Sequence, residues 1–229
     1  MQQVTIIVPV KDEEVGLQYL IKNLESSKIE EEFEIDFIFV IDDRTSDDSR
    51  QIATRMSKRI IDQSETYGKG AAIKQAINNW IQHQSQFVVF LDADGSYSFN
   101  GVREIISALL SGADVASGSR FISKKVRPKG MGAIHNLGNR VLSKISSIRN
   151  RRQISDLCTG LWGFKGEALK KIEIKSNGFD LEAELAGEVR KRKLSHSEVP
   201  IKWSQRKGGI SKLRSIRDGF IILARIMRT

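Results

Sequence analysis

The sequence predicts an α/β fold built on a parallel sheet, because apolar segments of strand length alternate with segments of helical spacing. Residues 4–10 (VTIIVPV) and 35–41 (IDFIFVI) are short and nearly continuously apolar, which is typical of strands covered on both faces of a sheet. Between them, residues 13–27 carry apolar side chains at helical spacing. This strand, helix, strand order predicts that the two strands pair in parallel.

The same alternation continues along the chain. Helices are expected at 46–58, 69–83 and 100–111, and strands at 59–62, 87–91 and 113–117. A chain of 229 residues with 28% charged residues and three prolines has the length and composition of an ordinary globular domain. We therefore expect one domain over residues 1–229, in which the halves 1–114 and 115–229 differ in character.

Polar residues follow the expected strands at three places. Lys11, Asp12 and Glu13 follow the first strand, Asp42 and Asp43 follow the strand at 35–41, and Asp92 and Asp94 follow the strand at 87–91. Ligands of open α/β sheets bind at the carboxyl ends of the strands, so these side chains should share one edge. Carboxylates gathered there repel each other unless a cation or a ligand rich in hydrogen-bond donors lies between them.

Asp92 and Asp94, in the run FVVFLDADGSY, are the candidate metal ligands. Side chains two residues apart in an extended segment point the same way. Hard cations such as Mg²⁺ and Mn²⁺ take oxygen ligands, and Mg²⁺ is usually held by one or two carboxylates together with substrate phosphates. The pair therefore predicts a Mg²⁺ or Mn²⁺ site, with a plain Asp-Gly turn as the alternative.

Charge is segregated along the chain. The net charge is −8 over residues 1–114 and +10 over 115–155, a stretch without an acidic residue. Such a field predicts an anionic partner, which can be a phosphorylated substrate, a membrane surface or nucleic acid; a solvated basic face is the alternative. Cys158 is the single cysteine, which excludes an internal disulfide and suits a reducing cytoplasm. No secretory signal or apolar run of transmembrane length is visible, so we expect a soluble or peripheral protein.

Two helices of the second half are expected to be amphipathic and basic. They cover residues 134–149 and 215–228. Their apolar stripes are Ile134, Leu137, Val141, Leu142, Ile145 and Ile148 in the first, and Ile216, Phe220, Leu223 and Met227 in the second. The flanking cations are Arg140, Lys144 and Arg149, and Arg214, Arg217, Arg225 and Arg228. Such helices can lie in a membrane interface; packing of the stripes onto the sheet is the alternative.

Several segments, taken together, resemble a known family. In chain order they are VPVKDEE, VIDDRTSDDS, YGKGAAIKQAI, FLDADGSYS, SGSRF and EVPIKWSQRKGGISKL. In this order and spacing they resemble glycosyltransferase family two, and most closely the polyprenyl-phosphate hexosyltransferases typified by dolichyl-phosphate mannose synthase. The resemblance implies a GT-A (Rossmann-like) fold, with a mixed, mainly parallel sheet flanked by helices and with amphipathic helices toward the C-terminus.

The resemblance also implies roles for particular residues. The nucleotide sugar would contact Pro9, Val10, Glu13, Asp42, Lys69, Asp92, Ala93, Asp94, Arg206 and Lys212. Asp92 and Asp94, with Ser96 as a weaker ligand, would hold Mg²⁺ or Mn²⁺. Arg120 and Arg140 would bind the acceptor phosphate, and Glu184 would lie near the sugar. Asp94, Arg120 and Arg206 would be the catalytic residues, whereas Asp180 and Glu182 are expected on an exposed helix surface.

The function that the resemblance implies is inverting transfer of a hexose, from GDP-mannose or UDP-glucose, to a polyprenyl (dolichyl) phosphate. The protein would be peripheral on the cytoplasmic face of a membrane. A lipid phosphate is already an anion at neutral pH, so its attack needs no strong general base, whereas the departing nucleoside diphosphate must be stabilised. A soluble sugar, phosphoglycerate or glycan acceptor is the alternative. We expect no nucleic-acid partner, because the basic half lacks the interleaved aromatic residues of single-strand binding platforms.

Overall fold

The computed structural model describes residues 1–123, 128, 130–213 and 215–229, so that Arg214 lies outside the described residues. Within these residues, seven strands form one sheet in the order β3-β2-β1-β4-β6-β5-β7. The strands are β1 (Gln2–Val10), β2 (Phe33–Asp42), β3 (Ile60–Gln63), β4 (Phe87–Phe90), β5 (Val115–Ser119), β6 (Trp162–Lys165) and β7 (His196–Pro200). β6 runs antiparallel to β4 and β5, and the other neighbours pair in parallel. The expected mixed, mainly parallel sheet is confirmed.

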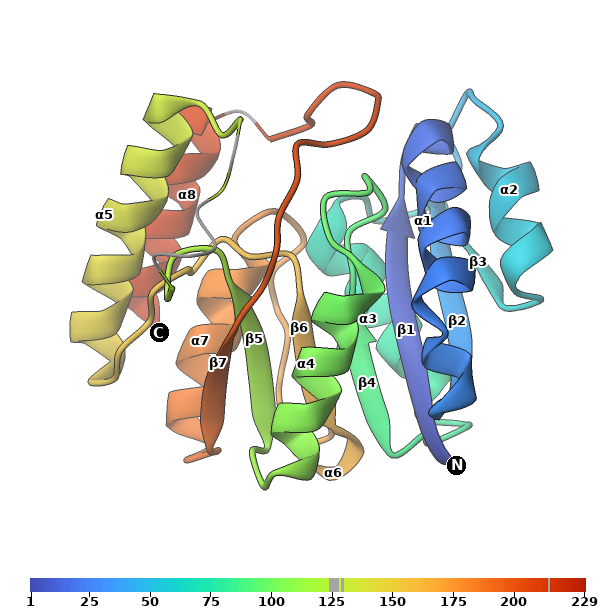
Figure 1. The fold of residues 1–229 in the computed structure, drawn as a ribbon. Helices are drawn as coiled ribbons and strands as arrows, with labels where there is room; N and C mark the ends of the chain where they lie inside the picture. Colours follow the sequence, from blue (N-terminus) through green and yellow to red (C-terminus); the bar gives the residue numbers. More distant parts are fainter. Residues whose placement is uncertain (124–127, 129, 214) are drawn as a thin grey trace.

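Helices cover both faces of this sheet (Figure 1). One face carries α1 (Glu14–Ser27), α2 (Ser49–Met56) and α4 (Phe99–Leu110). The other carries α3 (Lys69–Trp80), α7 (Leu181–Lys191) and α8 (Ser215–Arg228), with α5 (Ala133–Asn150) packed against α7 and α8. The short elements are η1 (Ile29–Glu31) and α6 (Gly166–Leu169).

The nearly continuous apolar runs of the central strands follow from this double covering. In β1, Val4, Ile6 and Val8 enter the core beneath α1, α2 and α4, whereas Ile7 enters the core beneath α3 and α7. A strand that is buried on both faces has no solvent-facing positions, so the period of two disappears from its sequence. The parallel register of β1 with β2 and β4 then brings the carboxyl ends of all three strands to one edge.

The second half contains elements that the sequence analysis did not assign. β6 is a four-residue strand inserted between β4 and β5, and it runs against both. β7 has mostly polar, half-buried residues and lies at the edge of the sheet. Short or edge strands carry neither a long apolar run nor a clean alternation, and periodicity therefore misses them.

α5 packs against the protein with its polar side. The buried side chains of this helix, which the structure describes throughout, are Asn139, Ser143, Ser146 and Asn150. The apolar side chains Ile134, Leu137, Val141 and Ile148 are 49% to 76% exposed, and only Leu142 and Ile145 touch the core. For the four exposed residues, the alternative that the stripe packs onto the sheet is wrong.

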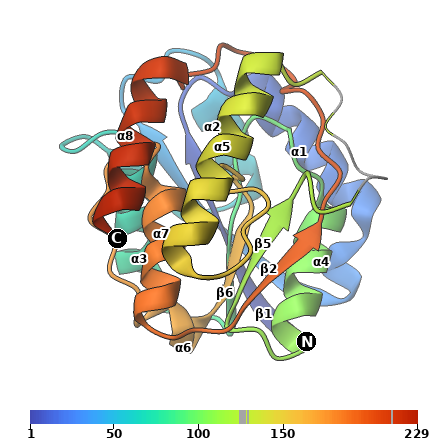
Figure 2. The same ribbon diagram turned by 90° about the vertical axis from the view of Figure 1, so that its left-hand side faces the viewer.

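α8 lies beside α5, as both views show (Figures 1 and 2). It buries Ile222 and Ile226, whereas Ile216, Phe220 and Met227 of its expected stripe are exposed. Together, α5 and α8 present an apolar outer surface, which we call the α5–α8 surface and define by Ile134, Leu137, Val141, Ile148, Ile216, Phe220 and Met227. In the described part of the chain, no helix has the length and apolar character needed to cross a membrane.

Candidate functional site

A cavity of about 470 Å³ opens at the carboxyl ends of β1, β2 and β4. After β1 it is lined by Pro9, Val10, Lys11 and Glu13; after β2 by Asp42 and Arg44; and after β4 by Asp92, Ala93, Asp94 and Ser96. Lys69, Arg120, Arg206 and Lys212 also line it. The structure thus brings together most of the predicted site residues, which are far apart in the sequence.

Asp94 is oriented by its neighbour Ser96. Its Oδ1 accepts hydrogen bonds from the backbone N–H of Ser96, at 2.9 Å, and from the hydroxyl of the same residue. Its Oδ2 lies 3.9 Å from Nη1 of Arg206. Ser96 is buried, so its hydroxyl is committed to Asp94 in this structure. One oxygen of Asp94 is therefore held in place while the other faces a cation.

Asp92 is confined by a glycine and by a buried ammonium group. A Cβ atom on Gly160 would lie 1.8 Å from Oδ2 of Asp92, so a larger residue at that position would displace the carboxylate of Asp92. The Nζ of Lys69 lies 2.6 Å from Oδ1 of Asp92 and 2.7 Å from Oε1 of Glu182. Burial alone would lower the pKa of Lys69, but the two carboxylates outweigh that effect and raise it, so the ammonium stays charged.

The predicted position of Glu182 is wrong. It was expected on an exposed helix surface, but its side chain is buried and lines the cavity from α7. Burial raises the pKa of Glu182, although Lys69 opposes the shift. The expectation is also wrong for Asp180, which is buried and receives the Nε of Arg225 at 2.7 Å. α7 lies between the sheet and the pair α5 and α8, so it has little exposed surface, and helical spacing alone does not reveal this.

Two predicted site residues lie outside the cavity. Glu184 accepts hydrogen bonds from the backbone N–H groups of Lys175 and Ser176, at 3.0 and 2.7 Å, and from Arg225. Through these bonds Glu184 holds the segment before α7 in place. The glutamate of this helix that faces the cavity is Glu182. Arg140 is exposed on α5, where its Nε donates to Asn136 and its guanidinium lies 5.3 Å from the ring centroid of Phe121.

The segment after β7 is held across the strand ends by Glu13. The Nη2 of Arg206 lies 2.7 and 2.8 Å from the two carboxylate oxygens of Glu13, and the Nζ of Lys212 lies 3.0 Å from Oε1. Figure 1 shows this segment arching over the end of the sheet on its way to α8. Burial raises the pKa of Glu13, whereas the two cations oppose the rise. Glu13 therefore fixes both cations at the rim.

Asp42 sits between two cations at the end of β2. Its carboxylate accepts from the Nζ of Lys11 at 3.0 Å and from the Nε and Nη2 of Arg44 at 2.8 and 2.6 Å. Burial opposes ionisation, but these hydrogen bonds outweigh it and lower the pKa of Asp42 to about 2. The guanidinium of Arg44 also lies 3.5 Å from the ring centroid of Tyr67. The sequence analysis missed Arg44, although its position two residues after Asp42 was a usable signal.

Arg120 is held in the cavity wall by buried partners. Its Nε and Nη2 donate to the two carboxylate oxygens of Asp156 at 2.6 and 2.7 Å, and Nη2 also donates to the carbonyl of Cys158 at 2.8 Å. Burial alone would lower the pKa of Arg120, but Asp156 raises it. Within the described residues, Nη1 has no recorded partner, which leaves it available to an anion in the cavity.

Apolar side chains also line this cavity. They are Phe179, Trp203, Leu213 and Ile222, and Ile222 belongs to α8. The cavity therefore combines charged groups at the strand ends with apolar side chains, one of which comes from a helix of the α5–α8 surface.

The carboxylates fit a divalent cation only if a ligand helps to hold it. Among the residues that the structure describes, no group of three or more His, Cys, Asp or Glu side chains could bind a metal. Asp92 and Asp94 supply hard oxygen donors that line the same cavity. Mg²⁺ is commonly bound by one or two carboxylates with phosphate oxygens and water completing its octahedron. The donor set fits Mg²⁺ or Mn²⁺ in that mode.

Three comparisons place the chain among known proteins. The model of the family "Glycosyl transferase family 2" matches residues 5–173. Glycosyltransferase AglJ of Haloferax volcanii is 30% identical over 192 residues, which cover 83% of this chain and 62% of that protein. Polyprenol monophosphomannose synthase of Mycolicibacterium smegmatis is 25% identical over 240 residues, which cover 97% and 86%.

Solved structures share the fold. The crystal structure of glucosyl-3-phosphoglycerate synthase from Mycobacterium tuberculosis, in complex with Mn²⁺, UDP and phosphoglyceric acid, has a TM-score of 0.73. The sequence identity is 15%, and the match covers 99% of this chain and 78% of that one. This likeness shows the fold alone.

Proposed function

We infer that this chain, which belongs to glycosyltransferase family 2, transfers a hexose from a nucleotide sugar to a polyprenyl phosphate at a membrane surface. The observation that carries the proposal is that one cavity has both charged and apolar lining. Its charged groups at the strand ends suit a sugar diphosphate. Its apolar lining includes Ile222 of α8, the helix whose exposed side chains form part of the α5–α8 surface, so a lipid chain can leave toward that surface. Residues 1–114 would carry most of the donor site, and residues 115–229 the acceptor site.

The donor would lie against the charged groups at the strand ends. Pro9, Val10, Asp42 and Ala93 would line the nucleotide, and Asp92 and Asp94 would hold Mg²⁺ or Mn²⁺, with Ser96 orienting Asp94. A bound divalent ion supplies positive charge beside the diphosphate. The ammonium of Lys69 and the guanidinium of Arg206 already lie against these carboxylates, so phosphate oxygens that enter can share the same cations. Glu182 is placed to accept hydrogen bonds from sugar hydroxyls.

The reaction we propose is a direct displacement. An oxygen of the acceptor phosphate forms a bond to the anomeric carbon, while the bond from that carbon to the nucleoside diphosphate breaks on the opposite side and the configuration inverts. Arg120 would hold the acceptor phosphate through its available Nη1, and Arg206 and Lys69 would stabilise the negative charge on the leaving group. Because the attacking phosphate is an anion, no residue needs to remove a proton first.

A donor and acceptor screen tests this function. The protein is incubated with labelled GDP-mannose or UDP-glucose, Mn²⁺ and either a short polyprenyl phosphate or a water-soluble acceptor, including phosphoglycerate. We expect the label to enter the lipid phase with one donor. Label found only on a soluble acceptor would contradict a lipid acceptor and support the alternative acceptor class. Phosphoglyceric acid, which is bound in the structure of glucosyl-3-phosphoglycerate synthase, belongs to that class.

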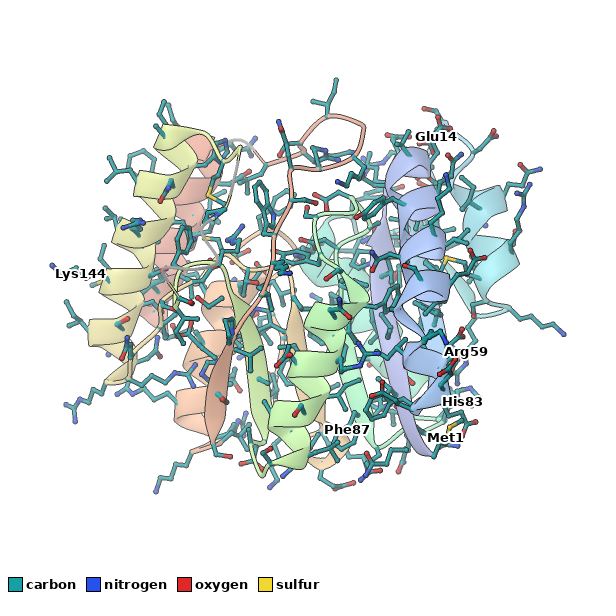
Figure 3. The ribbon with its side chains drawn as sticks, in the orientation of Figure 1. Met1, Glu14, Arg59, His83, Phe87 and Lys144 are labelled. Carbon is teal, nitrogen blue, oxygen red and sulfur yellow. The ribbon has the colours of Figure 1, made fainter. Side chains whose placement is uncertain are left out.

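The inverted packing of α5 supports a peripheral position on a membrane surface, which we propose is its cytoplasmic face. An amphipathic helix that buries its polar side and exposes its apolar side contacts an apolar medium on the outside. Cations flank the exposed stripe, and Lys144 of α5 points away from the body of the molecule (Figure 3). Basic groups beside an apolar stripe favour anionic lipid headgroups.

Substitutions on the α5–α8 surface should weaken membrane binding. Leu137 and Phe220 are 67% and 68% exposed, so changing both to Asp should not disturb the core. Removing two apolar contacts, each worth about 1 to 2 kcal/mol when partly buried in lipid, should lower partitioning onto anionic vesicles at least about tenfold. Flotation with vesicles measures the effect, and Leu110→Asp, at an exposed leucine on α4, is the matched control. Equal flotation of the double variant and the control would contradict the proposed surface.

A further inference from the structure

The buried polar side of α5 is bonded to one loop, residues 154–158. Ser147 Oγ donates to the carbonyl of Ile154 at 3.0 Å and accepts from its N–H at 2.9 Å. Ser143 Oγ accepts from the N–H of Leu157 at 2.9 Å. Three consecutive turns of the helix, including the turn that carries Asn139, therefore hold successive parts of the loop.

Asn139 makes the contact nearest the cavity. Its Nδ2 donates to Oδ1 of Asp156 at 2.7 Å, and its Oδ1 accepts from the N–H of Cys158 at 3.1 Å. One amide thus bonds both residues that hold Arg120, because Asp156 accepts from the guanidinium and Cys158 presents its carbonyl to Nη2. Serine or alanine cannot reach both groups, and aspartate cannot donate in its ionised form.

The carboxylate of Asp156 depends on such partners for its position. Its side chain has no solvent exposure, so every bond it makes is to protein. Arg120 supplies its backbone N–H, Nε and Nη2, and Asn139 supplies the remaining side-chain donor. On the far side of the loop, Glu198 of β7 accepts from the N–H groups of Ser155 and Asp156, which anchors the loop backbone but not the carboxylate.

We propose that Asn139 is a positioning residue that sets the guanidinium of Arg120 for the acceptor phosphate through Asp156 and Cys158. The proposal rests on the proposed function insofar as Arg120 binds the acceptor. Without Asn139, Oδ1 of Asp156 and the N–H of Cys158 each lose a buried partner, and the loop can shift to find others. The guanidinium should move with the loop, because among the described residues all of its hydrogen bonds go to residues 156 and 158.

α5 offers a matched control at Asn150. This residue is an asparagine on the same helix, buried to a similar degree. In the part of the chain that the structure describes, its Nδ2 bonds only to Ser146 of its own helix and its Oδ1 is buried without a partner, so Asn150→Ala removes no contact to the loop. Asn139→Ala and Asn150→Ala therefore differ mainly in that only the first removes hydrogen bonds to Asp156 and Cys158.

Kinetics give the first readout. Asn139→Ala should raise KM for the acceptor about tenfold, the size expected for a lost hydrogen bond that positions a charged group, and leave KM for the donor within about twofold. Asn150→Ala should change neither. Asn139→Ser, which keeps a small polar group but cannot reach both Asp156 and the N–H of Cys158, should also raise the acceptor KM, and it replaces the alanine variant if that variant does not fold. Equal changes in the KM of both substrates would overturn the proposal.

Cys158 gives a second readout that needs no substrate. It is the single cysteine of the chain, and its side chain is half-buried in the wall of the cavity. Desolvation raises the pKa of its thiol to about 12, so little thiolate is present near neutral pH and the folded protein should react slowly with thiol reagents. Asn139→Ala should accelerate labelling of Cys158 at least about tenfold under native conditions, whereas Asn150→Ala should not. If the wild-type protein transfers no sugar, this comparison still decides the proposal, because unchanged labelling in Asn139→Ala shows that Asn139 does not hold the loop.

Discussion

Asp94→Asn should lower the rate of hexose transfer by at least about 10³-fold, the loss expected when a charge that anchors transition-state stabilisation is removed. Asparagine keeps the shape and can still accept from Ser96 through its carbonyl oxygen, so the turn after β4 should survive. What is lost is the negative charge at the oxygen that faces Arg206 and the cavity. Neutral amide oxygen is a weaker ligand for Mg²⁺ or Mn²⁺ than carboxylate.

The measurement is the initial rate of transfer as a function of Mn²⁺ concentration, with and without EDTA. Asp62→Asn is the matched control, because Asp62 lies on β3 outside the cavity and pairs with exposed Arg50. We expect this control to keep the wild-type rate and the wild-type dependence on Mn²⁺. Full activity of Asp94→Asn in EDTA would contradict the metal role.

The sequence predicts well which carboxylates at the strand ends line the cavity, because the signal there is local. Asp92 and Asp94 follow an apolar run directly, and Asp42 follows another. Because the strands run parallel, their carboxyl ends and these side chains lie at one edge of the sheet. No long-range information is needed once the strands are known to be parallel. The same reasoning predicted the mainly parallel sheet, whereas the antiparallel β6 has no periodic signal of its own.

The sequence does not predict which residues from distant parts of the chain pair with the site residues. Lys69 is neutralised by Asp92 and by Glu182, and nothing near Glu182 in the sequence distinguishes it from Glu184, which faces away from the cavity. Which glutamate points inward depends on how α7 is rotated against the sheet. Packing sets that rotation, and the spacing of apolar residues does not reveal it when the helix is buried on most sides.

α5 shows a second limit of pattern reasoning. Its apolar stripe is evident from the sequence, but amphipathicity says only that two sides differ and does not say which side is buried. Here the polar side is inside because it satisfies the loop that holds Asp156. The apolar side is left outside, on a surface that we propose contacts lipid.

Arg120→Ala should have two separate effects, one on stability and one on transfer. Removing the guanidinium leaves the carboxylate of Asp156 buried without its main partner, and breaking a buried ion pair in this way costs about 3 to 5 kcal/mol of folding free energy. The urea midpoint of unfolding measures this loss. Loss of transfer by the single variant would therefore not distinguish a binding role for Arg120 from a role in holding the fold.

The double variant Arg120→Ala with Asp156→Asn separates the two effects. Asparagine removes the buried negative charge, and its carbonyl oxygen can still accept from Asn139, but its amide nitrogen then faces the backbone N–H of residue 120, so part of the lost stability should return. Transfer should stay at least about 10²-fold below wild type, because the acceptor phosphate still lacks its cation, and the acceptor KM should rise more than the donor KM. If the double variant regained both the urea midpoint and the transfer rate, Arg120 would serve only to neutralise Asp156, and the acceptor phosphate would have to be held by another cation of the cavity.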